Sequence, residues 1–254
     1  MNNDIQRASM LKRISAYIFD SILLITVAIG IAFLLSVVLK YDETTTERER
    51  LRNDYEVKYG VTFDIEREDY DKLSDTEKQL YDDAYAEFAS DADVNRIDAL
   101  IINLSMLITV FSILVAFIIF EFLIPLKFSN GQTLGKKIFG IGIMRVDGVK
   151  ISAFQLFVRA ILGKYTLETM IPTFLILFLL FNIMPFACLV GIALILIIQL
   201  GTTMFSYLHT PIHDLISGTV AVDFASQRIF ESTESLLEYK KKIHAETAKK
   251  TEYR

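Results

Sequence analysis

From Ile171 to Leu208 the chain reads IPTFLILFLLFNIMPFACLVGIALILIIQLGTTMFSYL, 38 residues without a single charge. A helix of about 20 apolar residues already crosses the hydrocarbon core of a bilayer, so this run is too long for one span. The segment Asn182-Ile183-Met184-Pro185 interrupts it, and proline disfavours helix at its own position and at the residue before it. We therefore predict a transmembrane helical hairpin in residues 165–208.

The first arm of this hairpin, residues 165–181, is short and contains Glu168 near its start. A carboxylate inside a span is costly unless it is paired. A re-entrant or surface-lying segment is therefore the alternative to a full span for this arm. The second arm, residues 185–207, is long and apolar enough to cross.

Two further apolar runs lie upstream of the hairpin. Residues 14–39 contain Asp20 as their only charge, and residues 100–126 contain Glu121 as theirs. The first run far exceeds the apolar core of about 7–15 residues in a signal peptide, so we expect it to be kept as a span. The runs together predict an all-α polytopic membrane protein with about four transmembrane helices.

The distribution of charge predicts the orientation of these spans. Residues 40–98 hold 9 basic and 19 acidic residues, whereas the whole chain has a net charge of −5, so the remainder of the chain is basic. Basic residues gather before the first span, between the second and third spans, and in the tail. By the positive-inside rule we expect a multi-pass protein of the plasma membrane with both termini cytoplasmic. The acidic insert argues against nucleic acid as a partner.

These spans divide the chain into six segments. They are a cytoplasmic stub with the first span (1–39), an extracellular, acidic and largely helical insert (40–98), the second span (99–126), a cytoplasmic elbow, hairpin and interfacial helix (127–164), the transmembrane hairpin (165–208), and a cytoplasmic closing motif with a charged tail (209–254).

The segments between the spans contain local signals of their own. In the acidic insert, Ser74 and Glu77 have the spacing of a helix capping box. In the cytoplasmic elbow, residues 141–152 alternate apolar and polar side chains around Asp147-Gly148, which predicts a small β-hairpin. The residues after this hairpin predict an amphipathic helix at the membrane interface.

No motif in the sequence predicts a catalytic, metal or cofactor site. His209, His213 and Asp214 lie close together, but Pro211 separates the histidines and no third ligand is evident. The glycines of residues 131–137 are too close for a phosphate-binding loop. No pairing of a nucleophile with a base is evident either, so we expect that the protein is not an enzyme and holds no cofactor. The single cysteine, Cys188, excludes an intrachain disulfide.

Charged residues at membrane depth are the strongest candidates for function. Arg13 and Asp20 are seven residues apart and share one face of the first helix, and Glu121 lies at a similar depth in the second. Such carboxylates should face inward and be paired. Two interpretations stay open: a structural latch that fixes helix packing, and an ion or proton relay.

Three blocks of this sequence resemble the RDD family of bacterial and archaeal membrane proteins, which is named for one arginine and two aspartates. The blocks are residues 12–20, residues 131–159 and residues 213–222. The resemblance places the name-giving residues at Arg13, Asp20 and Asp214. Positions that match the rest of the motifs are Gly131, Gly135, Lys136, Gly140, Asp147, Gly148, Arg159, His213 and Gly218. Residues 40–98 and the tail lie outside the resemblance.

The family is mostly without an assigned activity, and transport of small ions is the usual suggestion. We therefore expect cation/proton transport through a buried cluster of Arg13, Asp20, Glu121 and Asp214 near the cytoplasmic leaflet. The alternative is a non-catalytic membrane scaffold that binds partners and in which this cluster is a latch. The expected partners are the lipid bilayer, small cations, and further copies of the chain or other membrane proteins, because four helices are few for a transporter.

Overall fold

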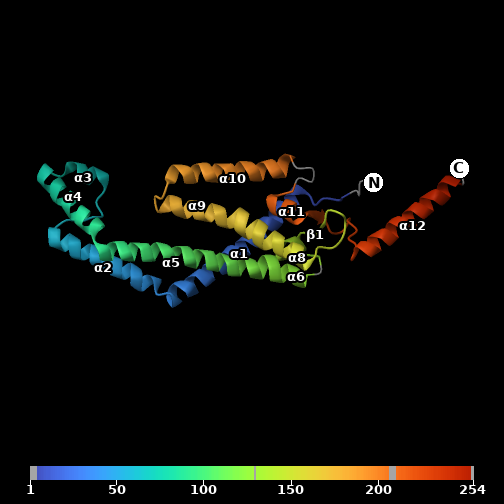
Figure 1. Ribbon diagram of the computed structural model, residues 1–254, viewed down its shortest axis with the longest axis horizontal. Helices are drawn as coiled ribbons and strands as arrows, with labels where there is room; N and C mark the ends of the chain where they lie inside the picture. The colour runs from blue at the N-terminus through green and yellow to red at the C-terminus, as the bar shows by residue number, and fades with distance from the viewer. Residues whose placement is uncertain (1–4, 129, 206–209, 253–254) are drawn as a thin grey trace. The chain divides into compact units, whose positions relative to one another are not determined.

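Four long apolar helices dominate the structure, a computed structural model that describes residues 5–128, 130–205 and 210–252 (Figure 1). Within these residues, four helical stretches are long and apolar enough to cross a membrane: Met10–Val38, Ala92–Lys127, Ala153–Leu180 and Pro185–Phe205. Only 6–22% of the most apolar window in each stretch is buried within the isolated chain, as expected for surfaces that face lipid. The predicted fold class, an all-α membrane protein with about four transmembrane helices, is confirmed, and the described residues also form a small two-stranded antiparallel sheet.

Two of these stretches combine α-helix with π-helix. The first and the fourth are the single helices α1 (Met10–Val38) and α10 (Pro185–Phe205). The second consists of α5 (Ala92–Phe117), η1 (Ile118–Leu123) and α6 (Ile124–Lys127). The third consists of α8 (Ala153–Phe157), η2 (Val158–Met170) and α9 (Ile171–Leu180).

The chain divides into two units, which we describe separately. The first unit holds Met1–Ala28 and Ile113–Arg254, and the second holds Ile29–Ser112.

In the first unit, α9 and α10 form the predicted helical hairpin and lie side by side (Figure 1). The break lies at Asn182 and Met184, which adopt left-handed backbone conformations just before Pro185. Gly191 lets the two helices approach, because a Cβ atom there would lie 3.0 Å from the side chain of Leu175.

The third span differs from the expectation at its start. We predicted an interfacial helix up to residue 164 and a separate arm from residue 165, but the helix is continuous from Ala153 to Leu180. Arg159 and Lys164 therefore lie inside it. Each has a carboxylate partner, so their charges do not have to reach water and the helix need not end there.

The small sheet joins two distant parts of the chain. Strand β1 (Ile141–Arg145) pairs antiparallel with β2 (Thr219–Asp223), with Ile143 opposite Ala221. The predicted hairpin is present only as a turn at Asp147-Gly148 and a single bridge between Met144 and Lys150. The sheet forms with β2 instead, because Val220 and Val222 bury Met144 completely.

Three further helices complete the first unit. They are α7 (Leu134–Ile138), α11 (Ile212–Ser217) and α12 (Thr233–Glu252). Helix α11 packs closely on η2 at Gly163, where a Cβ atom would lie only 2.6 Å from the Cβ atom of His213. This close approach brings the motif around His213 next to the third span.

The second unit contains α2 (Tyr41–Tyr59), α3 (Arg67–Lys72) and α4 (Asp75–Ser90), so the acidic insert is largely helical. The capping box of Ser74 and Glu77 is present at the start of α4. The apolar centre of the second unit is a group of aromatic rings in contact: Tyr55, Phe63, Tyr81, Tyr85 and Phe88. Ion pairs such as Arg48–Asp98 lie at the surface, where each is worth little.

Candidate functional site

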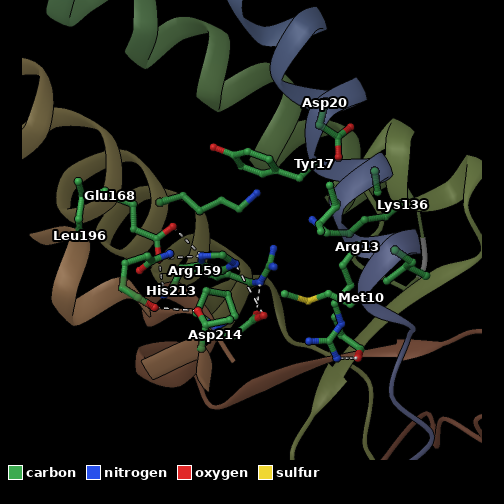
Figure 2. A pocket seen from close by; sticks show the side chains of 18 of the residues that line it. Met10, Arg13, Tyr17, Asp20, Lys136, Arg159, Glu168, Leu196, His213 and Asp214 are labelled. Carbon is green, nitrogen blue, oxygen red and sulfur yellow. Dashed lines mark hydrogen bonds and ion pairs between the residues drawn. The ribbon is translucent and has the colours of Figure 1, made fainter. Parts of the chain in front are cut away.

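The first unit contains a cavity of about 510 Å³ that is lined by seven charged residues among others (Figure 2). Helices α1, α7, α10 and α11, the π-helix η2 and both strands contribute to the wall. We call the following residues the charged set: the cations Arg13, Lys136, Arg159 and Lys164, and the carboxylates Asp20, Glu121, Glu168 and Asp214. All of them line the cavity except Glu121, which binds the lining residue Lys164.

Asp20 binds the start of α7. One carboxylate oxygen accepts a hydrogen bond from the backbone amide of Gly135 at 2.7 Å, and the other accepts from the hydroxyl of Thr133. Thr133 caps α7, since its hydroxyl also accepts from the amide of Lys136. Asp20 is only 7% exposed, so these donors replace the water that its charge would otherwise need.

Asp214 forms a buried ion pair with Arg159. The guanidinium Nε donates to a carboxylate oxygen at 2.7 Å, and both side chains are 2% exposed. The hydroxyl of Thr219 donates to the same oxygen at 2.8 Å. Burial alone would raise the pKa of Asp214, but attraction by Arg159 outweighs it and holds the pKa below its usual range. Asp214 is therefore ionised at neutral pH.

His213 lies between two carboxylates (Figure 2). Its Nδ1 is 2.8 Å from a carboxylate oxygen of Glu168, and its backbone amide donates to the same side chain at 3.0 Å. Its Nε2 is 3.7 Å from a carboxylate oxygen of Asp214. Burial lowers the pKa of His213 below its usual value, although both acids oppose the shift. The ring is therefore neutral at pH 7 and can accept a proton.

Arg13 reaches into the same cavity from α1 (Figure 2). Its guanidinium donates to the backbone carbonyl of Ala221 at 2.8 Å and is attracted by Asp214. The three residues that the family resemblance placed together, Arg13, Asp20 and Asp214, thus all line one cavity. Asp20 accepts its hydrogen bonds described above from Thr133 and Gly135. Asp214 accepts those described above from Arg159 and Thr219.

Glu121 and Lys164 form a second buried ion pair. The second carboxylate oxygen of Glu121 is also buried, and it has no hydrogen-bond partner among the described residues. This pairing confirms that Glu121 faces inward, as expected for a carboxylate inside a span.

Lys136 is the least compensated member of the charged set. Its ammonium nitrogen is buried although the residue is partly exposed, and it has no hydrogen-bond partner within the part of the chain that the structure describes. Burial, with repulsion by Lys164 and Arg159, lowers the pKa of Lys136 to about 7 against the attraction of Glu121 and Asp20. Lys136 can therefore gain or lose a proton near neutral pH.

The other motif residues lie in turns that shape the site. Gly131, Gly140, Gly148 and Gly218 have positive φ angles, and Gly218 ends α11 directly before β2. Asp147 pairs with Arg145 beside the turn at Gly148. His209 lies outside the described residues.

Three contributors to this site were not predicted from the sequence. In the sequence, Glu168 counts only against a full span of residues 165–181. The expectation that a carboxylate at membrane depth faces inward and is paired applies to Glu168 as much as to Asp20 and Glu121. Thr133 and Thr219 carry no such signal, since a hydroxyl becomes a specific donor to Asp20 or Asp214 only after folding.

One comparison with known proteins gives a match. The sequence pattern described as "RDD family" matches residues 7–218, which is most of the chain and includes the whole charged set. No curated protein and no solved structure matches the chain significantly.

Proposed function

Because the chain belongs to the RDD family of membrane proteins, we propose that it exchanges small cations for protons through the cavity of its charged set. We further propose that it lies in the plasma membrane with both termini in the cytoplasm and acts as an oligomer or with other membrane proteins. The basic stretches around residues 7–13 and 127–164 support this orientation. The proposal assigns no enzymatic reaction to the chain.

The position of His213 is the observation that carries the proposal. A neutral imidazole between Glu168 and Asp214 can take a proton on one ring nitrogen and release one from the other. The ring lines a cavity that α1 and α10, two of the candidate spans, also line. Ionisable groups inside a bundle of membrane helices commonly mark such proton paths.

The cavity also suits a small cation. Its wall presents carboxylates from α1, η2 and α11, so oxygen ligands approach from several directions. Hard cations prefer oxygen ligands of this kind. A volume of about 510 Å³ leaves room for a cation with part of its water shell.

The scaffold alternative is favoured by a different observation. Asp20 gives its two carboxylate oxygens to Gly135 and Thr133, and Asp214 is held by Arg159 and Thr219. Buried carboxylates with such hydrogen bonds suit a latch that joins the first span to the cytoplasmic motifs. Both roles are compatible if these aspartates hold the cavity in shape while Glu168 and His213 move protons.

The test is cation-dependent proton flux in proteoliposomes that carry a pH gradient, with sodium, potassium, lithium and calcium added in turn. Wild type and Glu168→Gln are reconstituted in equal folded amounts. The matched control is Asp98→Asn, which removes a carboxylate from the surface ion pair with Arg48. Flux in wild type and control that is lost in Glu168→Gln is the expected result. Absence of flux in wild type with every cation would leave the scaffold alternative.

A further inference from the structure

We propose that Lys136 holds the proton that is exchanged, and that a monovalent cation takes the place of this proton beside Glu121 and Asp20. This inference rests on the proposed cation/proton exchange. It names the residue that binds the exchanged proton and the charge of the exchanged cation. No element of the family resemblance assigns such a role to Lys136.

The environment of the Lys136 ammonium supports this role. Its nitrogen is buried in the wall of the cavity and has no hydrogen-bond partner among residues 5–128, 130–205 and 210–252. A buried ammonium without hydrogen bonds is costly, so the charge should be lost or exchanged readily. By contrast, the ammonium of Lys164 is held by Glu121, and the guanidinium of Arg159 is held by Asp214.

Charged groups from three elements act on this ammonium. Asp20 acts on Lys136 from α1, Glu121 from η1, and Arg159 and Lys164 from η2. From α1, Arg13 and Tyr17 also line the cavity (Figure 2).

Glu121 has a buried oxygen without a partner among the described residues. An unsatisfied cation and an unsatisfied carboxylate oxygen thus attract each other within one buried cluster. A small cation bound at that oxygen would compensate Glu121 whenever Lys136 is neutral.

The balance of charge in the charged set favours a monovalent ion. The charged set has four cations and four carboxylates, and His213 is neutral at pH 7, so the set has no net charge while Lys136 is protonated. When the proton leaves, the set carries one negative charge. A monovalent cation restores neutrality, whereas a divalent cation leaves an excess positive charge, which is unfavourable at a buried site.

The exchange step is balanced in atoms and charge. The N–H bond of the Lys136 ammonium breaks, the electron pair stays on the nitrogen, and the proton goes to water in the cavity. One cation enters for each proton that leaves. Because the pKa of Lys136 is lowered to about 7, both forms are populated at neutral pH.

The test measures proton release from purified protein in detergent micelles, in weak buffer with a pH indicator, when sodium or potassium chloride is added. Because about half of Lys136 is already neutral at pH 7, wild type should release about half a proton per bound cation there and approach one proton per cation as the pH is lowered toward about 6. Lys136→Met should bind the cation without releasing a proton. Lys136→Arg keeps a permanent charge and should weaken binding by about tenfold or more. The matched control is Lys137→Met, which removes the neighbouring, exposed lysine and should behave as wild type.

A second measurement needs no variant and so does not depend on how the variants fold. Carbon-13 NMR of methyl-labelled lysines should show one lysine that titrates near neutral pH in wild type, and sodium should shift its titration to lower pH. If every lysine titrates near the ordinary value of about 10.4, the inference is wrong.

The outcomes separate the two proposals. Equal proton release from wild type and Lys136→Met would overturn the role of Lys136 and leave the proposed exchange intact. If wild type binds neither sodium nor potassium and releases no proton, the proposed exchange itself fails and the inference fails with it. Binding of calcium in preference to both would overturn the assignment of a monovalent ion.

Discussion

The carboxylate of Asp20 accepts a hydrogen bond from the backbone amide of Gly135, 115 positions later in the chain, at 2.7 Å. This bond ties the first span to the short helix that carries Lys136. It also explains why a glycine stands at position 135. A Cβ atom there would lie 2.5 Å from the backbone oxygen of Ala16 and 3.0 Å from the carboxylate of Asp20.

Asp20→Asn should lower the stability of the folded protein. The amide keeps one acceptor oxygen, so either Thr133 or Gly135 loses its buried acceptor, which costs about 1–3 kcal/mol. Thermal unfolding in detergent micelles measures this cost, with Asp98→Asn at the surface as control. An unchanged unfolding temperature would argue against a latch at Asp20.

Gly135→Ala should also be destabilising, because the added methyl group forces α7 away from α1. Overpacking of this kind costs about 1–3 kcal/mol. Gly30→Ala is the control, since a Cβ atom at Gly30 meets nothing within 4 Å. In a helix that control should be neutral or slightly stabilising. Equal unfolding temperatures for the two variants would contradict the close contact.

The pair of Arg159 and Asp214 should behave as a coupled unit. Removing either partner leaves an unpaired buried charge, which costs about 3–5 kcal/mol. The double variant Arg159→Met/Asp214→Asn should recover part of this loss. A double-mutant cycle should give a coupling of about 2 kcal/mol or more, against less than about 1 kcal/mol for the surface pair of Arg48 and Asp98. Additive effects at Arg159 and Asp214 would contradict the pairing.

His213→Gln should slow proton flux in proteoliposomes by about tenfold or more, because glutamine can hydrogen-bond Glu168 but cannot carry a proton at neutral pH. Wild-type flux should depend on pH below neutrality, since burial lowers the pKa of His213. His244→Gln changes an exposed histidine and should have no effect. Proton flux with an unchanged pH profile in His213→Gln would show that His213 does not carry the proton.

Lys136→Met should be more stable than wild type at low pH, and this difference in stability should shrink as the pH rises. The pKa of Lys136 is about 7 in the folded protein and 10.5 in its ordinary state, so the folded state binds fewer protons between these values. The penalty of the buried charge is fully present below pH 7, shrinks between pH 7 and 10.5, and is absent above. Unfolding of both proteins from about pH 6 to about pH 9 measures how the difference in their free energy of unfolding decreases. A gap that does not change with pH would contradict the lowered pKa.

The spans, the helical hairpin and the cluster members Arg13, Asp20, Glu121 and Asp214 were predictable because a charge in an apolar run is conspicuous. The partner of β1 was not predictable in the same way. Alternation around Asp147-Gly148 predicts a hairpin from local pattern alone, whereas burial of Val220 and Val222 against Met144 depends on a segment more than 70 positions away.

The sequence by itself determined the class of the protein, because the length and apolarity of a helix that crosses a bilayer are properties of one continuous segment. It also determined which carboxylates must be paired, since an ionised group in an apolar run cannot stay unpaired. Only the tertiary structure decided the partners: Asp20 with Thr133 and Gly135, and Asp214 with Arg159. The same holds for Lys136, whose buried ammonium lacks a partner among the described residues. Hydrogen bonds and burial depend on distances of a few ångströms between segments far apart in the chain, and no local pattern contains those distances.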